Sequence, residues 1–448
     1  MLRRFAISGF LFCLVLTAGA RTRPSYGGTL RMETTGDPWQ MPDGVARRLV
    51  LDTLTTIGES GAAQPALAIR WESQDAAHRW EFVLRPGVRF HDGTPLTAES
   101  AIASLDQVCA NGSIGPCPWS AVRAVGSSVI FVADSPVPDL PELLAQTGFG
   151  IFRKDSNGAM DGTGPFRVSG FQNGALILTA NDDSWQGRPF LDSIAIYPHR
   201  AIRDQWLDLS VGNADMVEVP PEMLRQAQQQ RLNVLVSRPV DLLALTIAPD
   251  GPLSSPGVRQ SIALAVDRAA LCNVIFQKQG EITASLLPES LSGYAFLFST
   301  DRDLDRARVL RGGATPPVLA LAVDDTGASM QLAAERLVLN LHEAGFNVQI
   351  ASSISHPAPL TLRRVYLQAA SPRAALDEML ARFGQNGTVS GTDPASVWQS
   401  EQAALANATI VPLLWLPRAW AVGERVRDLS LSPDGMPSLA NASVEGTQ

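Results

Sequence analysis

The stretch 80–105 constrains the fold of this chain more than any other part of the sequence. Apolar and polar residues alternate over 80–85 and again over 88–91, which is the period of a β-strand. An Arg-Pro-Gly turn separates the two expected strands, and Asp-Gly follows the second one. Thr97 then has the side chain of a helix N-cap, with an acidic residue in the turn after it. The pattern predicts a rigid scaffold of two strands and a helix, and it contains no obvious catalytic group.

Length and composition indicate a large globular protein. The chain has 448 residues, of which 45% are hydrophobic and 18% charged. A chain of this length has room for two or three domains with large cores. The net charge of −8 leaves no surplus of basic residues to neutralise phosphates, so nucleic acid is excluded as the main partner.

The N-terminus has the pattern of a cleavable export signal. Arg3 and Arg4 precede an apolar run at 5–16, and the small residues at 18–20 fit a cleavage site. We therefore expect residues 1–20 to be a signal peptide and the mature protein to be periplasmic. Cys13 follows a phenylalanine, which argues against a lipoprotein. No later stretch is apolar enough over its length to predict a transmembrane helix.

Three cysteines remain after the expected cleavage. In an exported protein we expect Cys109 and Cys117 to form a disulfide that closes a short loop. Cys272 lies in an apolar helical stretch and is predicted to be a buried free thiol. No pair has the spacing of a zinc site, and no other pattern predicts a metal or a cofactor.

Further along the chain, several patterns indicate an α/β protein. The glycines at 162–164 are followed by a proline and by no Gly-Lys-Ser/Thr, so we interpret them as a turn before a strand and not as a phosphate loop. A change in composition near 248 predicts a domain boundary. The order strand, helix, strand over 318–350 predicts a parallel unit.

Three separate segments resemble one known family. The segments 84–99, 162–192 and 258–271 are similar to signatures of the peptide/nickel/opine family of extracytoplasmic solute-binding proteins of ABC importers, family 5. The resemblance implies the two-lobed α/β fold of periplasmic binding proteins, type II-like, with mixed sheets. It also implies a hairpin-containing subdomain at about 45–155. The lobe boundaries that follow are 25–245 plus 409–448 for lobe one, and 246–408 for lobe two.

The same resemblance implies the function. We expect a monomer that captures a small solute, such as a peptide or an opine, by closing its lobes at two crossovers. It would then deliver the solute to a membrane permease with its ATPase. One alternative is a diverged binding or sensor protein that does not serve transport. Another is a secreted hydrolase on the same scaffold, although no GxSxG, SxxK or HExxH motif supports it.

Clefts for small solutes combine aromatic walls with a few fixed polar groups. Aromatic residues in turn-rich segments are therefore candidates for ligand contacts, together with nearby charged residues. Similarity to segments that line the ligand cleft of relatives favours Trp39, Trp119 and Tyr366. The full set of candidate ligand-binding residues is Glu33, Asp37, Trp39, Trp119, Tyr294, Tyr366, Arg373 and Trp415.

The resemblance weakens over 351–407, which is shorter than in most relatives. Peptide binders of the family carry an acidic group after the strand that corresponds to 361–367, where it pairs with the ammonium group of the ligand. The run 366–373 of this chain contains no acid. Two hypotheses follow. The ligand is anionic, with Arg363, Arg364 or Arg373 as its partner, or lobe two has lost solute binding.

Overall fold

The computed structural model of the protein describes residues 26–445, apart from 41–43, 112–116, 155–157, 159, 294–297, 314–316, 325–326, 352–357, 386–388, 390 and 392. The predicted signal peptide, Cys13 and the candidate ligand residue Tyr294 lie outside the described residues. Within the described part, no helix combines the length and the hydropathy needed to cross a bilayer.

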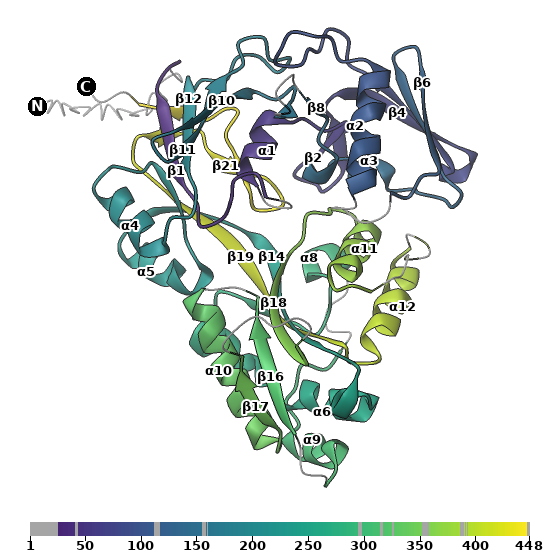
Figure 1. Cartoon of the computed structure of the whole chain (residues 1–448), viewed down its shortest axis with the longest axis vertical. Coiled ribbons are helices and arrows are strands. Elements are labelled where there is room, and N and C mark those ends of the chain that lie inside the picture. The colour runs from purple at the N-terminus through teal and green to yellow at the C-terminus, as the bar shows by residue number, and fades with distance from the viewer. Residues whose placement is uncertain are drawn as a thin grey trace, which may run out of the picture.

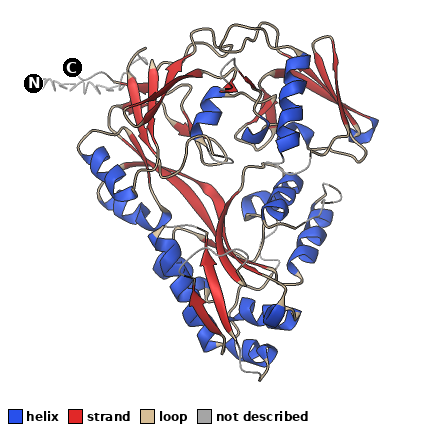
Figure 2. Ribbon diagram, viewed as in Figure 1, coloured by secondary structure: helices blue, strands red, loops and turns tan. Residues whose placement is uncertain are grey.

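One large mixed sheet runs through the molecule (Figures 1 and 2). Among the described residues it has 11 strands, in the order β10-β11-β12-β1-β13-β19-β14-β18-β16-β17, with β15 beside β19. Pairing is parallel where β1 meets β12 and β13, and where β16 meets β17 and β18. The strands are β1 (Thr29–Glu33), β10 (Phe166–Gln172), β11 (Ala175–Ala180), β12 (Ser193–Tyr197), β13 (Met216–Glu218), β14 (Asn233–Ile247), β15 (Glu281–Ile282), β16 (Val318–Val323), β17 (Asn347–Ile350), β18 (Leu360–Tyr366) and β19 (Ile410–Val422).

Parallel neighbours need a crossover, and helices provide it at both ends of the sheet. Helix α4 (Ile202–Ser210) leads from β12 to β13, and α10 (Ala328–Glu343) leads from β16 to β17. The predicted parallel strand-helix-strand unit at 318–350 is therefore confirmed. The other helices are α1 (Val45–Val50), α2 (Ala98–Asn111), α3 (Leu140–Leu143), α5 (Leu224–Gln229), α6 (Pro256–Ala265), α7 (Arg268–Ala270), α8 (Glu289–Ser292), α9 (Leu304–Arg311), α11 (Pro372–Arg382) and α12 (Pro394–Leu405).

The long strands β14 and β19 connect the two ends of the sheet. They pair with each other over most of their length, with register shifts between Val236 and Asp241. One end of this pair joins β13 and the other end joins β18. The two strands therefore belong both to the part of the sheet around β1 and to the part around β16. The predicted lobe boundaries near 245 and 409 lie at the end of β14 and the start of β19, and they stay a prediction.

A smaller sheet forms the region drawn at the top right of Figure 1. It has the order β4-β5-β7-β6, and α2 contacts β6 and β7. Its strands are β4 (Ala68–Gln74), β5 (Arg79–Leu84), β6 (Ala121–Val125) and β7 (Ser128–Val132). Short two-stranded pairs elsewhere are β2 (Thr55–Ile57) with β3 (Ala63–Pro65), β8 (Arg153–Lys154) with β9 (Met160–Asp161), β20 (Val426–Arg427) with β23 (Ser443–Val444), and β21 (Ser430–Leu431) with β22 (Pro437–Ser438).

The structure confirms part of the opening pattern and corrects one part. The first expected strand is β5 and the expected helix is α2. The second expected strand, over 88–91, is only an isolated bridge between Arg89 and Pro95, because the chain folds back at once through Asp92 and Gly93. Thr97 caps α2 reciprocally with Ser100, since each backbone N–H donates to the hydroxyl of the other residue, at 2.9 and 3.2 Å. The predicted disulfide between Cys109 and Cys117 is present, and Cys272 is a buried free thiol.

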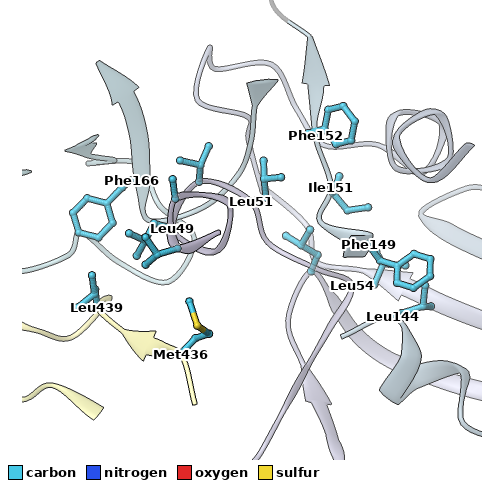
Figure 3. Close-up of a cluster of buried hydrophobic side chains, with 14 of the residues drawn as sticks. Leu49, Leu51, Leu54, Leu144, Phe149, Ile151, Phe152, Phe166, Met436 and Leu439 are labelled. Carbon is cyan, nitrogen blue, oxygen red and sulfur yellow. The ribbon is translucent and has the colours of Figure 1, made fainter. Parts of the chain in front are cut away.

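Helix α1 is the centre of the largest hydrophobic core. Figure 3 shows its side chains between β10, the C-terminal segment and the residues that follow α3. Gly162 and Gly164 lie directly against the end of α1, because a Cβ on either one would fall within 2.0–2.6 Å of a carbonyl oxygen of Leu49 or Val50. The glycines at 162–164 therefore serve close packing of a turn, as expected, and not phosphate binding.

Candidate solute-binding cavity

A cavity of about 200 Å³ lies between the two parts of the molecule. From the predicted lobe one, α1, β2, the residues after α3 and the loop 432–434 line it. From the predicted lobe two, α8 and the segment 367–370 line it. The residues 238–240 of β14, in the stretch of shifted register that joins the two parts, complete the wall. The cavity therefore combines elements that are far apart in the sequence.

The segment 367–370, within the run 366–373 where the family resemblance implied an acid, is held in place by a carboxylate from α11. Glu378 accepts hydrogen bonds from the backbone N–H groups of Gln368 and Ala369, at 3.2 and 2.8 Å. The same carboxylate forms an ion pair with Arg382 at 2.6 Å. These bonds occupy Glu378 in positioning the cavity wall, so it does not replace the missing acid.

A charged group forms one side of the cavity. Arg48 of α1 forms an ion pair with Asp434 and donates a hydrogen bond to the hydroxyl of Tyr366, at 3.3 Å. Burial opposes ionisation of Asp434, but the charge of Arg48 and several hydrogen bonds outweigh it, and the pKa of Asp434 is lowered. Asp434 is therefore ionised at neutral pH and already neutralised by Arg48. Burial and the neighbouring Asp434 raise the pKa of Tyr366 well above its usual value, so its hydroxyl stays protonated.

Behind this group lies a second, more deeply buried cluster of charges. Asp241 of β14 is 1% exposed and forms ion pairs with Arg364 at 2.7 Å and with Arg418 at 2.9 Å. Burial disfavours the charge on Asp241, yet the two guanidinium groups lower its pKa. The guanidinium of Arg418 also lies 3.8 Å from the centre of the Tyr366 ring, in a cation–π contact. The cluster fixes the end of β18, and with it the ring of Tyr366.

Outside the cavity, one carboxylate pairs with groups on both sides. Asp139, at the start of α3 in lobe one, pairs with Arg373 at the start of α11 in lobe two, at 2.6 Å. The hydroxyl of Ser371 donates to the same carboxylate, also at 2.6 Å. The side chains of Asp139 and Arg373 are only 8% and 12% exposed. This contact directly connects the start of α3 to the start of α11.

Of the predicted ligand residues on β1 and in the loop after it, none lines this cavity. Glu33 is buried, 3.6 Å from the Nε atom of Arg200, and burial raises its pKa. The carboxylate of Asp37 accepts a hydrogen bond from the backbone of Trp39 at 2.7 Å, and Trp39 packs against the core of lobe one.

The other predicted residues divide into one near the cavity and several in packing or paired positions. Tyr366 belongs to the charged group at the cavity. Trp119 packs against Phe131, with ring centres 5.0 Å apart, and Trp415 is fully buried in the core beside α11. The three arginines proposed as anion partners are each paired with an aspartate: Arg363 with Asp324, Arg364 with Asp241, and Arg373 with Asp139.

Sequence reasoning missed the charged residues that do line the cavity, namely Arg48, Arg238 and Asp434. Arg48 lies within a short helix, Arg238 precedes a proline in a strand, and Asp434 precedes a glycine in a turn. Each position is ordinary by itself. The break that Pro239 makes in an otherwise regular strand was the one local signal that could have drawn attention to Arg238.

Comparisons with known proteins agree with the fold. A family model described as bacterial extracellular solute-binding proteins, family 5 middle, matches residues 62–393. The chain is 28% identical over 246 residues to YhjP of Bacillus subtilis, covering 52% of this chain and 40% of that protein. It is 24% identical over 341 residues to a probable di/tripeptide-binding protein of Pseudomonas aeruginosa, covering 65% and 64%. The chain therefore spans less than two thirds of the length of either relative.

The solved structure of the binding protein AgaA from A. tumefaciens R10, in complex with agropinic acid, has the same fold. The TM-score is 0.80 at 20% sequence identity, covering 94% of this chain and 99% of that one. The mixed α/β architecture is thus that of the two-lobed periplasmic binding proteins, as the sequence predicted. Because the family model matches most of its length, the chain belongs to the bacterial extracellular solute-binding proteins of family 5.

Proposed function

We propose that the protein is the periplasmic solute-binding component of an ABC import system. One observation carries the proposal. Residues from both predicted lobes line the cavity, and the strand β14, which runs between the lobes, completes its wall. A solute in this position would be enclosed by a change in the angle between the lobes, with residues 25–245 plus 409–448 as lobe one and 246–408 as lobe two. The bulged stretch of β14 is where we expect the chain to bend.

The solutes named for two similar proteins support this assignment. One is described as a probable di/tripeptide-binding protein, and AgaA is seen with agropinic acid, so proteins of this fold hold small organic solutes. We infer that the mature protein is exported through the signal peptide at 1–20, acts as a monomer, and delivers its solute to a membrane permease and its ATPase. It would catalyse no reaction and need no cofactor. Of the predicted ligand residues, Tyr366 is the one we retain for the site.

The proposal is tested by filling the cavity. Ala370 lines the cavity, whereas Ala381 is exposed on α11 and does not line it. We expect one class of solute, from a panel of small acids, amides, amines, sugars and short peptides, to raise the melting temperature of the wild-type protein saturably. A solute at 100 times its Kd stabilises by about 2.7 kcal/mol.

The stabilisation should persist in Ala381→Trp and disappear in Ala370→Trp. Both variants add the same side chain, so a general effect of tryptophan would appear in both. A panel in which no class of solute stabilises the wild-type protein, or an Ala370→Trp variant that binds as the wild type does, would contradict the proposal.

A further inference from the structure

The guanidinium of Arg238 differs from the other charged groups of the cavity. Arg48 and Asp434 neutralise each other, as described above. The guanidinium of Arg238 makes no ion pair or hydrogen bond with any residue that the structure describes, whereas its backbone carbonyl accepts a hydrogen bond from the hydroxyl of Ser237. Arg238 is solvent-exposed, so its charge is hydrated in the absence of a solute. The cavity therefore has one positive charge in excess.

Among the described residues that line the cavity, no carboxylate is available for a cationic group of a solute. Asp434 is paired with Arg48, and Glu378, behind the wall, is held by two backbone N–H groups and Arg382. Drawing Asp434 away from Arg48 would leave a largely buried guanidinium without its partner, which is costly. An ammonium group would thus meet an unpaired cation and a neutralised acid. An anionic group would meet a free planar fork of N–H donors.

The remaining polar groups of the cavity are suited to an uncharged body. Gln146 and Gln368 are among the residues that line the cavity, and a side-chain amide offers both a donor and an acceptor. A cavity of about 200 Å³ suits a compact solute.

We propose, resting on the function proposed above, that the solute is a compact organic monoanion whose carboxylate binds Arg238. The rest of the solute is uncharged and contacts the amide side chains of the two lobes. Since Arg238 lies in the stretch that joins the lobes, closure would remove water from the guanidinium and the carboxylate together. A charge-assisted, bidentate pair becomes stronger as water leaves.

The test compares acids with their neutral amides. The probes are lactate with lactamide, pyroglutamate with its amide, and benzoate with benzamide, together with a cationic arm of glycinamide and ethanolamine. The readout is the melting temperature and the titration heat of the full mature chain. We expect at least one acid to bind saturably and its amide to bind at least 10-fold more weakly, since a hydrogen bond to a charged group corresponds to a factor of roughly 10 to 100 in affinity.

Arg238→Gln should lower the affinity for that acid by roughly 10- to 100-fold and leave the affinity for its amide almost unchanged. Arg225→Gln on α5 removes the same charge from an exposed position that does not line the cavity, and it should bind the acid as the wild type does. Equal binding of acid and amide, undiminished binding in Arg238→Gln, or binding by none of the acids would overturn the proposal.

The two proposals fail differently. A neutral or cationic probe that binds at least as tightly as the best acid, and that Ala370→Trp blocks, would leave the import function standing and refute the monoanion. Failure of every solute in both panels would refute the function itself, and the monoanion with it.

Discussion

The contact between Asp139 and Arg373 allows a quantitative prediction about lobe closure. It is a direct ion pair between the subdomain of lobe one and α11, with both side chains almost buried. If the lobes separate, both charges become hydrated and the pair is lost. The strength of the pair is therefore part of the free energy that holds α3 against α11.

Removal of one partner from a fully buried pair costs about 3–5 kcal/mol. The cost should be smaller here, because Arg373 also has Asp377 at 3.8 Å and a hydrogen bond to a backbone carbonyl, while Asp139 keeps the hydroxyl of Ser371. We expect a coupling free energy of about 2 kcal/mol from the double-mutant cycle of Asp139→Ala and Arg373→Ala. This energy corresponds to a roughly 30-fold change in the ratio of closed to open molecules.

The assay is small-angle X-ray scattering without solute, combined with urea unfolding of the four proteins in the cycle. Either single variant should have a larger radius of gyration than the wild type. Arg427→Ala, which removes a half-exposed ion pair within lobe one, should not change it. Unchanged radii in both single variants, together with strictly additive stabilities, would show that this pair does not hold the lobes together.

Three further predictions concern stability and thiol chemistry. Asp241 is an acid with a lowered pKa, so its stabilising effect is present above pH 4 and is lost as the pH falls through the native pKa. Asp241→Asn should cost about 3 kcal/mol at pH 7 in urea unfolding, and a difference that persists unchanged at pH 2.5 would contradict this reasoning. Reducing the Cys109–Cys117 disulfide, which spans 8 positions, should lower the free energy of unfolding by about 2.5 kcal/mol, and equal urea midpoints with and without reductant would contradict the estimate. Because burial raises the pKa of the Cys272 thiol, we expect a thiol reagent to label it only in the unfolded mature chain, and fast labelling in buffer would show that it is accessible.

Much of the fold was predictable because it depends on short-range patterns. Alternation identified β5, and the cap at Thr97 located the start of α2. The strand expected at 88–91 failed because alternation over four residues does not ensure a neighbouring strand to pair with. In the structure these residues fold back on themselves through a tight turn, and only one bridge forms.

The candidate site was mostly not predictable, because residue type does not reveal a partner. Arg363, Arg364 and Arg373 were reasonable anion-binding candidates by type, but each has an aspartate beside it. Trp415 was selected as an aromatic residue near a crossover, and there the strand lies in the middle of the sheet, so its side chain is covered. Whether a charge is free or neutralised depends on residues that are distant in the chain.

The sequence by itself determined the family, the mixed α/β class and the disulfide, since each depends on spacing within a short segment or on a sum of such segments. Only the tertiary structure decided the cavity. Arg48, Arg238 and Asp434 come from a helix, a strand and a turn that the chain brings together by pairing β14 with β19 and packing the C-terminal segment on α1. That assembly neutralises Arg48 with Asp434 and leaves the guanidinium of Arg238 without a partner among the described residues, because the position of each charge is set by the packing of the elements that carry it.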